Sequence, residues 1–188
     1  MEGAIVFASL VMGVAITDQL TSLHRLLRVR HRVRWDPLPM IFALMALMTV
    51  LMIWWALAGM GSGRITIGEF VPIMFELTLV FLLTSASLPD AGGEGATGGT
   101  DLRAFWDKER SYLWSLLFIL VLFDHLGNFV TMEKSWAAWR YYLLNRSVDL
   151  VLTGALLAAV FVRRRWYDWT LIAVLAIGPI RWLNNALG

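Results

Sequence analysis

The sequence contains no cysteine, and this absence excludes several classes of function. Disulfide bonds, thiolate metal sites, iron–sulfur clusters and cysteine nucleophiles all need a thiol that the chain does not have. Common catalytic motifs are missing as well: the sequence has no zinc-protease motif, no glycine-flanked serine elbow and no phosphate loop ending in Lys-Ser or Lys-Thr. The sequence therefore predicts no metal site and identifies no cofactor.

Charged residues are also scarce. They make up 16% of the 188 residues, against about a quarter in soluble proteins, and 59% of the residues are hydrophobic. The mean hydropathy is +0.66, and the charges gather between long apolar runs. This combination predicts a single membrane domain over residues 1–188. Membrane topology explains the net charge of +2 and the pI of about 9.3, so we expect no nucleic-acid partner.

About twenty predominantly apolar residues suffice to cross the hydrocarbon core of a bilayer. Six segments approach or meet this length: residues 3–23, 40–58, 65–88, 112–131, 143–162 and 166–187. We therefore predict an all-α integral membrane protein, a bundle of six transmembrane helices. The first segment lacks the positive start and the small-residue cleavage site of a secretory signal peptide, so we expect it to be retained.

The connections between these segments differ in character. Residues 36–39 contain two prolines and predict a turn. Residues 89–103 are rich in glycine and predict a flexible cytoplasmic loop between two halves of three spans each. Residues 101–110 predict a short amphipathic lead-in at the membrane surface, and residues 132–142 predict an aromatic-rich interfacial connection. With three spans per half, any likeness between the halves would be an inverted repeat, as in many transporters.

Arginine gathers in two loops. One follows the first span and contains Arg25, Arg28, Arg30, Arg32 and Arg34; the other, residues 163–165, follows the fifth span. Six alternating spans put both loops on one side, which the positive-inside rule makes cytoplasmic. We therefore predict a protein of the cytoplasmic (inner) membrane with both termini outside. The first loop is either this topology signal alone or a contact for anionic lipid head groups or an acidic partner surface.

Several ionisable residues fall inside the predicted spans, where a charge needs a partner, a proton or water. Glu76 lies near the midplane of the third span, and Arg181 lies in the outer half of the sixth. The candidate residues of an ion or proton pathway are Glu76, Asp124, His125, Asp149 and Arg181. The supporting polar residues are Asp18, Glu69, Asn128, Arg146 and Asn184.

Two interpretations of these residues stay open. In the functional one, Glu76 and Asp124 bind ions or protons in a polar cavity that opens outward. Arg181 or His125 then tunes the protonation of the carboxylates. In the structural one, the charges only hold helices together. The pairs expected in that case are Glu76 with Arg181, Arg146 with Asp149, and Asp124 with Asn128 or a neighbouring helix.

The leading hypothesis is a channel or transporter for a small ion, with protons as one candidate. A structural or accessory subunit of a membrane complex is the first alternative, and the chain is compatible with a homo-oligomer or another membrane partner. An intramembrane enzyme that acts on a lipid, with Asp124 and His125 as acid and base, is the second. Because this last hypothesis has no nucleophile or metal motif, we expect the protein not to be an enzyme.

Overall fold

The computed structural model describes residues 2–59, 66–90, 99–131 and 135–186, and about 89% of it is helical. The seven α-helices of this part are α1 (Glu2–Arg28), α2 (Pro37–Gly59), α3 (Ile67–Ala86), α4 (Leu102–Thr131), α5 (Trp136–Asn145), α6 (Ser147–Phe161) and α7 (Arg165–Ala186). A 3-10 turn (Arg30–Arg32) and two short strands, β1 (Val33–Arg34) and β2 (Thr100–Asp101), complete the described elements.

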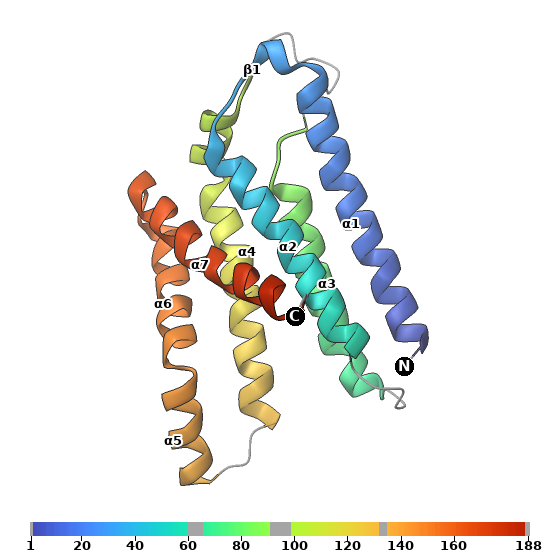
Figure 1. Ribbon diagram of the computed structural model, residues 1–188, viewed down its shortest axis with the longest axis vertical. Coiled ribbons are helices and arrows are strands. Elements are labelled where there is room, and N and C mark those ends of the chain that lie inside the picture. Colours follow the sequence, from blue (N-terminus) through green and yellow to red (C-terminus); the bar gives the residue numbers. More distant parts are fainter. Residues whose placement is uncertain (1, 60–65, 91–98, 132–134, 187–188) are drawn as a thin grey trace.

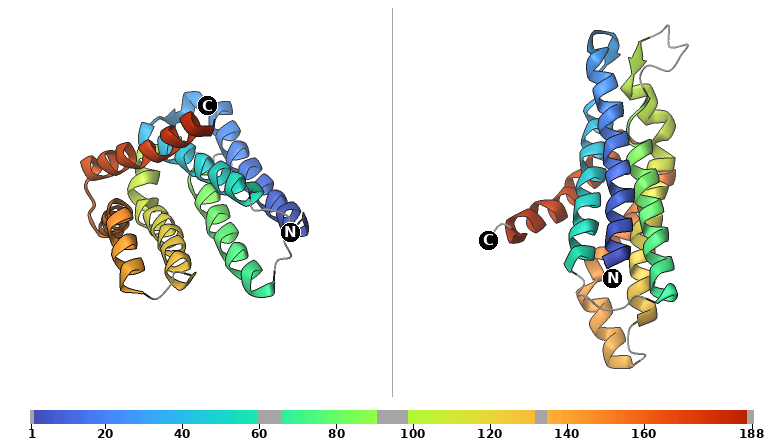
Figure 2. Two further views of the ribbon diagram at one scale, coloured as in Figure 1. Left: turned by 60° about the horizontal axis from the view of Figure 1, so that its bottom comes forward. Right: turned by 90° about the vertical axis from the view of Figure 1, so that its right-hand side faces the viewer.

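Helices α1, α2, α3, α4 and α6 run side by side in an elongated bundle (Figure 1). α1 packs mainly on α3, and α4 packs on both α6 and α3. α5 extends beyond the end of α4 at the bottom of the view (Figure 1). α7 packs on α2 and α6, but it crosses the bundle obliquely, and its C-terminal half projects away from the other helices (Figure 2).

Three helices are long and apolar enough to cross a membrane: α1 from Gly3, α2, and α4 as far as Asn128. α5 and α6 pass the same test together, although they are bent by 66° at the break between them. The described chain is thus a helical protein with three such helices, or four when the bent pair is one span. This confirms the predicted helical membrane class. α3 offers only a shorter apolar stretch, Phe70–Ala86, and α7 is not among the candidate spans, so length and composition do not establish six spans.

The prediction of a turn at residues 36–39 is wrong, because α2 already begins at Pro37. The backbone N–H of Leu38 donates to the Asp36 carboxylate at 3.0 Å, which caps the helix. Proline suits the first helical position, since the amide hydrogen that it lacks would have no intrahelical partner there.

The prediction of a surface lead-in at residues 101–110 is also wrong. α4 runs without interruption from Leu102, and the Asp101 carboxylate caps it by accepting the backbone N–H groups of Arg103 (2.8 Å) and Ala104 (3.1 Å). Leu102, Trp106 and Arg110 are buried. Their spacing of four residues puts them on one face of the helix, which packs into the core, while the intervening charges stay on the other face.

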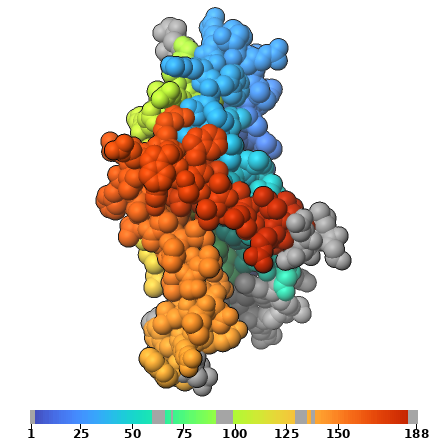
Figure 3. Space-filling model, turned by 60° about the vertical axis from the view of Figure 1, so that its left-hand side comes forward, coloured from blue at the N-terminus to red at the C-terminus, as the bar shows by residue number. Residues whose placement is uncertain are grey.

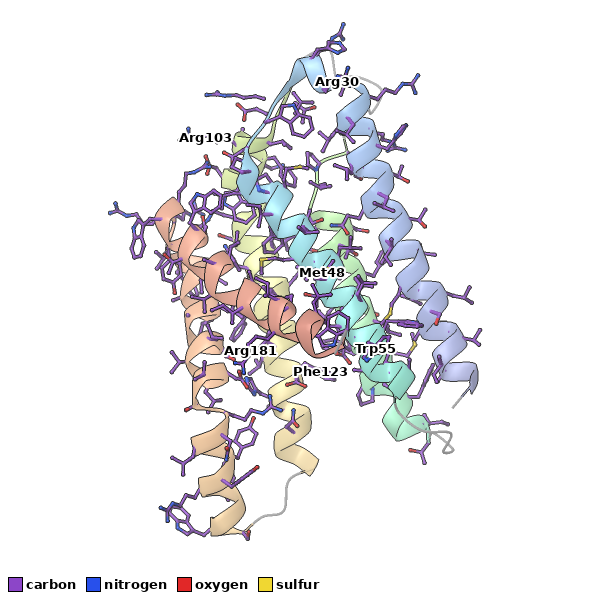
Figure 4. All side chains as sticks on the ribbon, viewed as in Figure 1. Arg30, Met48, Trp55, Arg103, Phe123 and Arg181 are labelled. Atoms are coloured by element: carbon purple, nitrogen blue, oxygen red, sulfur yellow. The ribbon has the colours of Figure 1, made fainter. Side chains whose placement is uncertain are left out.

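The arginine-rich loops meet at one end of the bundle. Strand β1 pairs in parallel with β2, so Val33 lies beside Thr100, and Arg34 Nη1 bonds Asp101 Oδ2 at 3.2 Å. Arg165 Nη2 bonds Asp36 Oδ2 at 2.5 Å, which ties residues 163–165 to the end of the first loop. We call the end that holds residues 24–36, 99–103 and 163–165 the basic end, and the opposite end the distal end. Arg30 and Arg103 both lie at the basic end (Figure 4).

Candidate functional site

A buried ion pair near the basic end joins α4 to α7. Arg110 Nη2 lies 2.5 Å from Asp168 Oδ1, and these side chains are only 4% and 1% exposed. Arg110 Nε also donates to Asp168 Oδ2 at 3.2 Å. The indole N–H groups of Trp106 (3.1 Å, to Oδ2) and Trp114 (3.0 Å, to Oδ1) donate to the same carboxylate. Each carboxylate oxygen of Asp168 therefore accepts one bond from arginine and one from tryptophan, whereas Arg110 Nη1 is buried and has no hydrogen-bond partner among the described residues.

The same arginine fixes the end of α6. Arg110 Nη2 donates to the carbonyl oxygens of Val162 at 2.7 Å and Ala159 at 3.4 Å, where a helix end leaves carbonyls without intrahelical partners. Phe42 of α2 packs edge-on against Trp106 and Trp114, with ring centroids 5.4 and 5.3 Å away. The cluster thus joins α2, α4, α6 and α7, and its chemistry is structural.

Sequence reasoning missed this cluster. It interpreted residues 101–110 as surface and gave Asp168 no role. The available signal was the spacing of Trp106, Arg110 and Trp114, which are four residues apart and therefore share one helix face. The partner, Asp168, lies 58 residues from Arg110 in the chain, and only the tertiary fold brings the two together.

The distal half holds the predicted acids. Glu76 on α3 is half-buried, and it lies near enough to Asp124 on α4 for the two carboxylates to repel each other. Their sequence neighbours, Phe75 and Phe123, pack together with ring centroids 4.9 Å apart. Among the described residues, no ion pair or hydrogen bond engages the Glu76 carboxylate, so the expected pair with Arg181 is not formed within the chain.

His125 lies in a chain of hydrogen bonds between helices. It is buried; its Nε2 is 3.0 Å from Thr153 Oγ1 on α6, and its Nδ1 is 3.0 Å from Tyr142 Oη on α5. Thr153 Oγ1 already donates to the Asp149 carbonyl at 2.8 Å, so it accepts from His125. In a neutral imidazole the proton then lies on Nε2, and Nδ1 accepts the Tyr142 hydroxyl.

This chain of hydrogen bonds spans the break between α5 and α6. The expected interfacial connection at 132–142 is helical from Trp136 onward, and the predicted fifth span is interrupted at Arg146. Arg146 Nη1 bonds Asp149 Oδ2 at 3.1 Å, which confirms the expected pair, but both side chains are 44% exposed. The negative charge of Asp149 is thus paired with Arg146 at the first turn of α6.

The other predicted residues lie apart from Glu76. Asn128 donates to the backbone carbonyl of Asp124 at 2.8 Å. Asp18 accepts a hydrogen bond from Ser85 of α3. Arg181 is exposed on α7 and has no ion pair within the described residues. The side chains of Glu69 and Asn184 lie outside the described part of the structure, as does most of the glycine-rich loop.

The arginines of the first loop are exposed at the basic end. Arg25 pairs with Asp90 and Arg34 with Asp101, so both bonds join residues that lie far apart in the sequence. Arg28, Arg30 and Arg32 are exposed to solvent. They can therefore contact a lipid surface or a partner without breaking an internal pair.

One groove lies beside the acids. It has a volume of about 460 Å³ between α3 and α4, and it is lined by Val71, Pro72, Phe75, Ile119, Leu122, Phe123 and Leu126. All of these side chains are apolar, so the groove suits an acyl chain or an apolar helix face. In the part of the chain that the structure covers, no group of three or more metal-binding side chains occurs.

The geometry defines the class of the protein as a helical membrane protein with a structural ion cluster near one end and unpaired acids toward the other. Comparisons with protein-family models, with curated proteins and with solved structures find no match to this chain.

Proposed function

We propose that the protein lets a small cation, in the first instance a proton, cross the membrane through the acids and the histidine of its distal half. The observation that carries this proposal is the unpaired Glu76. A carboxylate inside a span needs a partner, a proton or water. No cation of the described chain pairs with Glu76, and its ionised neighbour would be another acid, Asp124. Taking up a proton or binding a cation removes both difficulties.

The contrast between Glu76 and the buried Asp168 near the basic end supports this proposal over a purely structural role for Glu76. There the chain gives the buried Asp168 four hydrogen bonds, two of them from Arg110. A carboxylate whose role is to hold helices together is satisfied in this way. Glu76 is not, which is the pattern of a group that exchanges its partner during function.

His125 supplies a second proton-handling group beside these acids. Its Nδ1 accepts from Tyr142 and its Nε2–H donates to Thr153, so a proton arriving at Nδ1 can be balanced by one leaving from Nε2. Thr153 in turn donates to the backbone carbonyl of Asp149, and the Asp149 carboxylate pairs with Arg146. This sequence of bonds leads from the α5–α6 break into the bundle.

The proposal includes six membrane-crossing segments in two inverted halves. In it, α3 and α7 cross the membrane in addition to α1, α2, α4 and the bent pair of α5 and α6. Both termini then lie outside a cytoplasmic (inner) membrane, and the basic end faces the cytoplasm under the positive-inside rule. The ion pair between Arg165 and Asp36 supports a common side for the two arginine-rich loops. The exposed Arg28, Arg30 and Arg32 contact anionic lipid head groups there.

An accessory subunit of a membrane complex is the second candidate function. It is favoured by α7, whose C-terminal end projects beyond the bundle (Figure 3). Ile177 and Ile180 of this helix are exposed. Such a helix offers a contact surface even if no ion passes through the chain.

The test is ion flux into liposomes that contain the purified protein, with protons, K⁺ and Na⁺ compared separately. Glu76→Gln keeps the shape of the side chain and removes its charge, and we expect it to abolish flux. Asp107→Asn is the matched control, because Asp107 is exposed on the first turns of α4. Absence of flux from the folded wild type, for every ion, would contradict the proposal and favour the accessory subunit.

A further inference from the structure

Helix α7 carries an arginine that its own chain leaves unpaired. Arg181 is exposed and has no ion pair or hydrogen bond with the residues that the structure describes. Along the same helix, Trp166, Trp169, Ile177 and Ile180 are exposed and lie at helical spacing along one face. We call these four residues the α7 stripe. Lipid tails suit the stripe, but a guanidinium at membrane depth needs an anion or water.

The complementary features occur on α3 and α4. The apolar groove between these helices is open, with Val71 59% and Leu126 51% exposed. Pro72 lines the groove, and Glu76, four residues further on, lies one helical turn above it on the same side of α3. An apolar groove with an unpaired carboxylate on a neighbouring position of α3 matches an apolar helix face with an unpaired arginine.

The two features also match in depth. Trp182, next to Arg181, packs against Trp55 with ring centroids 6.2 Å apart, so both lie at the same height in the bundle. Figure 4 places Arg181 at about the height of Trp55 and Phe123. Phe123 in turn packs on Phe75, which lines the groove.

Contacts of α1 also relate the height of Trp54 to that of Glu76. Trp54 bonds Ser9 at 3.1 Å, and Phe7, two residues before Ser9, packs on Phe70 of α3 with ring centroids 6.0 Å apart. Phe7 and Phe70 therefore lie at one level along the bundle. With a rise of about 1.5 Å per residue, Ser9 lies about 3 Å from this level toward the basic end, and Glu76 lies about 9 Å from it in the same direction. Glu76 and Ser9, which marks the height of Trp54, thus differ by about 6 Å along the bundle. An extended arginine side chain can reach across this difference.

Copies of one membrane protein share the same orientation and depth in the bilayer. Arg181 of one copy therefore stays level with Glu76 of its neighbour when the two rotate about the membrane normal. α7 packs on α2 and α6, whereas the groove lies between α3 and α4, so one copy can offer the helix and the groove together. Such head-to-tail contacts close into rings when the rotation permits.

We propose that the groove between α3 and α4 receives α7 of a second copy of this chain, with Ile177 and Ile180 in the groove and Arg181 paired with Glu76. The contact completes the polar site with a cation that the single chain does not bring to it. It uses the same Glu76 as the proposed pathway, but it concerns contact between copies and not flux. Either proposal can fail while the other holds.

The absence of native cysteine makes a direct test simple. Val71→Cys is placed in a copy with one affinity tag and Ile180→Cys in a copy with another, and the two are co-expressed and oxidised in native membranes. The expected product is a disulfide-linked pair that carries both tags. Leu10→Cys replaces Val71→Cys as the matched control, because Leu10 is exposed on α1 next to Ser9 and so lies at the same depth.

Charge reversal then tests the ion pair in the same assay. Arg181→Glu, added to the copy that carries Ile180→Cys, should abolish the two-tag product. Glu76→Arg, added to the copy that carries Val71→Cys, should then restore it. Equal cross-linking to Leu10→Cys would show random collision and overturn the proposal. If no two-tag product forms with wild-type charges, the groove does not receive α7 of a second copy and lipid occupies it instead. A product that is insensitive to both charge reversals would refute the pairing of Arg181 with Glu76.

Discussion

Replacing Asp168 by asparagine should unfold the basic end of the bundle, because it leaves Arg110 charged and buried. Oδ1 accepts from Arg110 and Trp114, and Oδ2 accepts from Arg110 and Trp106. Whichever oxygen becomes the amide nitrogen, one arginine N–H and one indole N–H then face another donor. Removing one partner of a buried ion pair destabilises a protein by about 3–5 kcal/mol.

This loss is large enough to measure by thermal unfolding in detergent. For a chain of about this size, 1 kcal/mol lowers the melting temperature by roughly 2–4 °C, so we expect a fall of about 6–20 °C. Asp149→Asn is the control, because it breaks an ion pair in which both side chains are 44% exposed. Exposed pairs contribute about 0–1 kcal/mol, so this variant should melt within a few degrees of the wild type.

If Asp168→Asn melts as high as Asp149→Asn, the buried pair of Arg110 and Asp168 does not contribute the expected stability, and the prediction is refuted. The double variant Arg110→Met with Asp168→Asn adds a second check. Residues in direct contact do not contribute independently, so its loss of stability should be smaller than the sum of the two single losses. Simple additivity would mean that the arginine and the aspartate do not act as a pair.

Three further predictions concern other contacts. Thr153→Val leaves His125 Nε2–H without its acceptor, which should cost about 1–3 kcal/mol, whereas Thr153→Ser keeps the hydroxyl; equal melting temperatures of the two variants would contradict the bond. Ala104 and Arg103 backbone N–H groups and the Arg34 guanidinium hold the pKa of Asp101 below its usual 3.8, so its contribution to stability is present above that pH and lost below it. Between about pH 5 and about pH 3 the wild type should thus lose stability relative to Asp101→Asn, and parallel melting curves would contradict this. Gly99→Ala would place a Cβ against the carbonyl oxygen of Arg32, so it should weaken the pairing of β1 with β2 and increase amide exchange at Val33, and unchanged exchange would contradict the clash.

The features that the sequence predicted are those that depend on local pattern. Apolar runs identified helices that can cross a membrane, and the three-residue spacing of Arg146 and Asp149 predicted their ion pair. The two arginine-rich loops were expected on the same side, and the bond from Arg165 to Asp36 puts them at the same end of the bundle.

The features that the sequence did not predict depend on contacts between distant residues. Burial of Arg110 follows from Asp168, which lies in another helix, so its own segment looked like a charged surface. The oblique course of α7 follows from its packing on α2 and α6, which no periodicity encodes. The break at Arg146 lies in a stretch that contains neither proline nor glycine between Trp136 and Leu152, and the polar residues Asn145, Arg146 and Ser147 are the local signal that marks it.

Proton passage through Glu76 is tested by the initial rate of proton flux into liposomes after a pH step, measured for wild type and Glu76→Gln side by side. We expect flux through the wild type and a rate for the folded variant equal to that of protein-free liposomes. Equal flux through both proteins would show that Glu76 carries no proton, and it would contradict the proposed pathway.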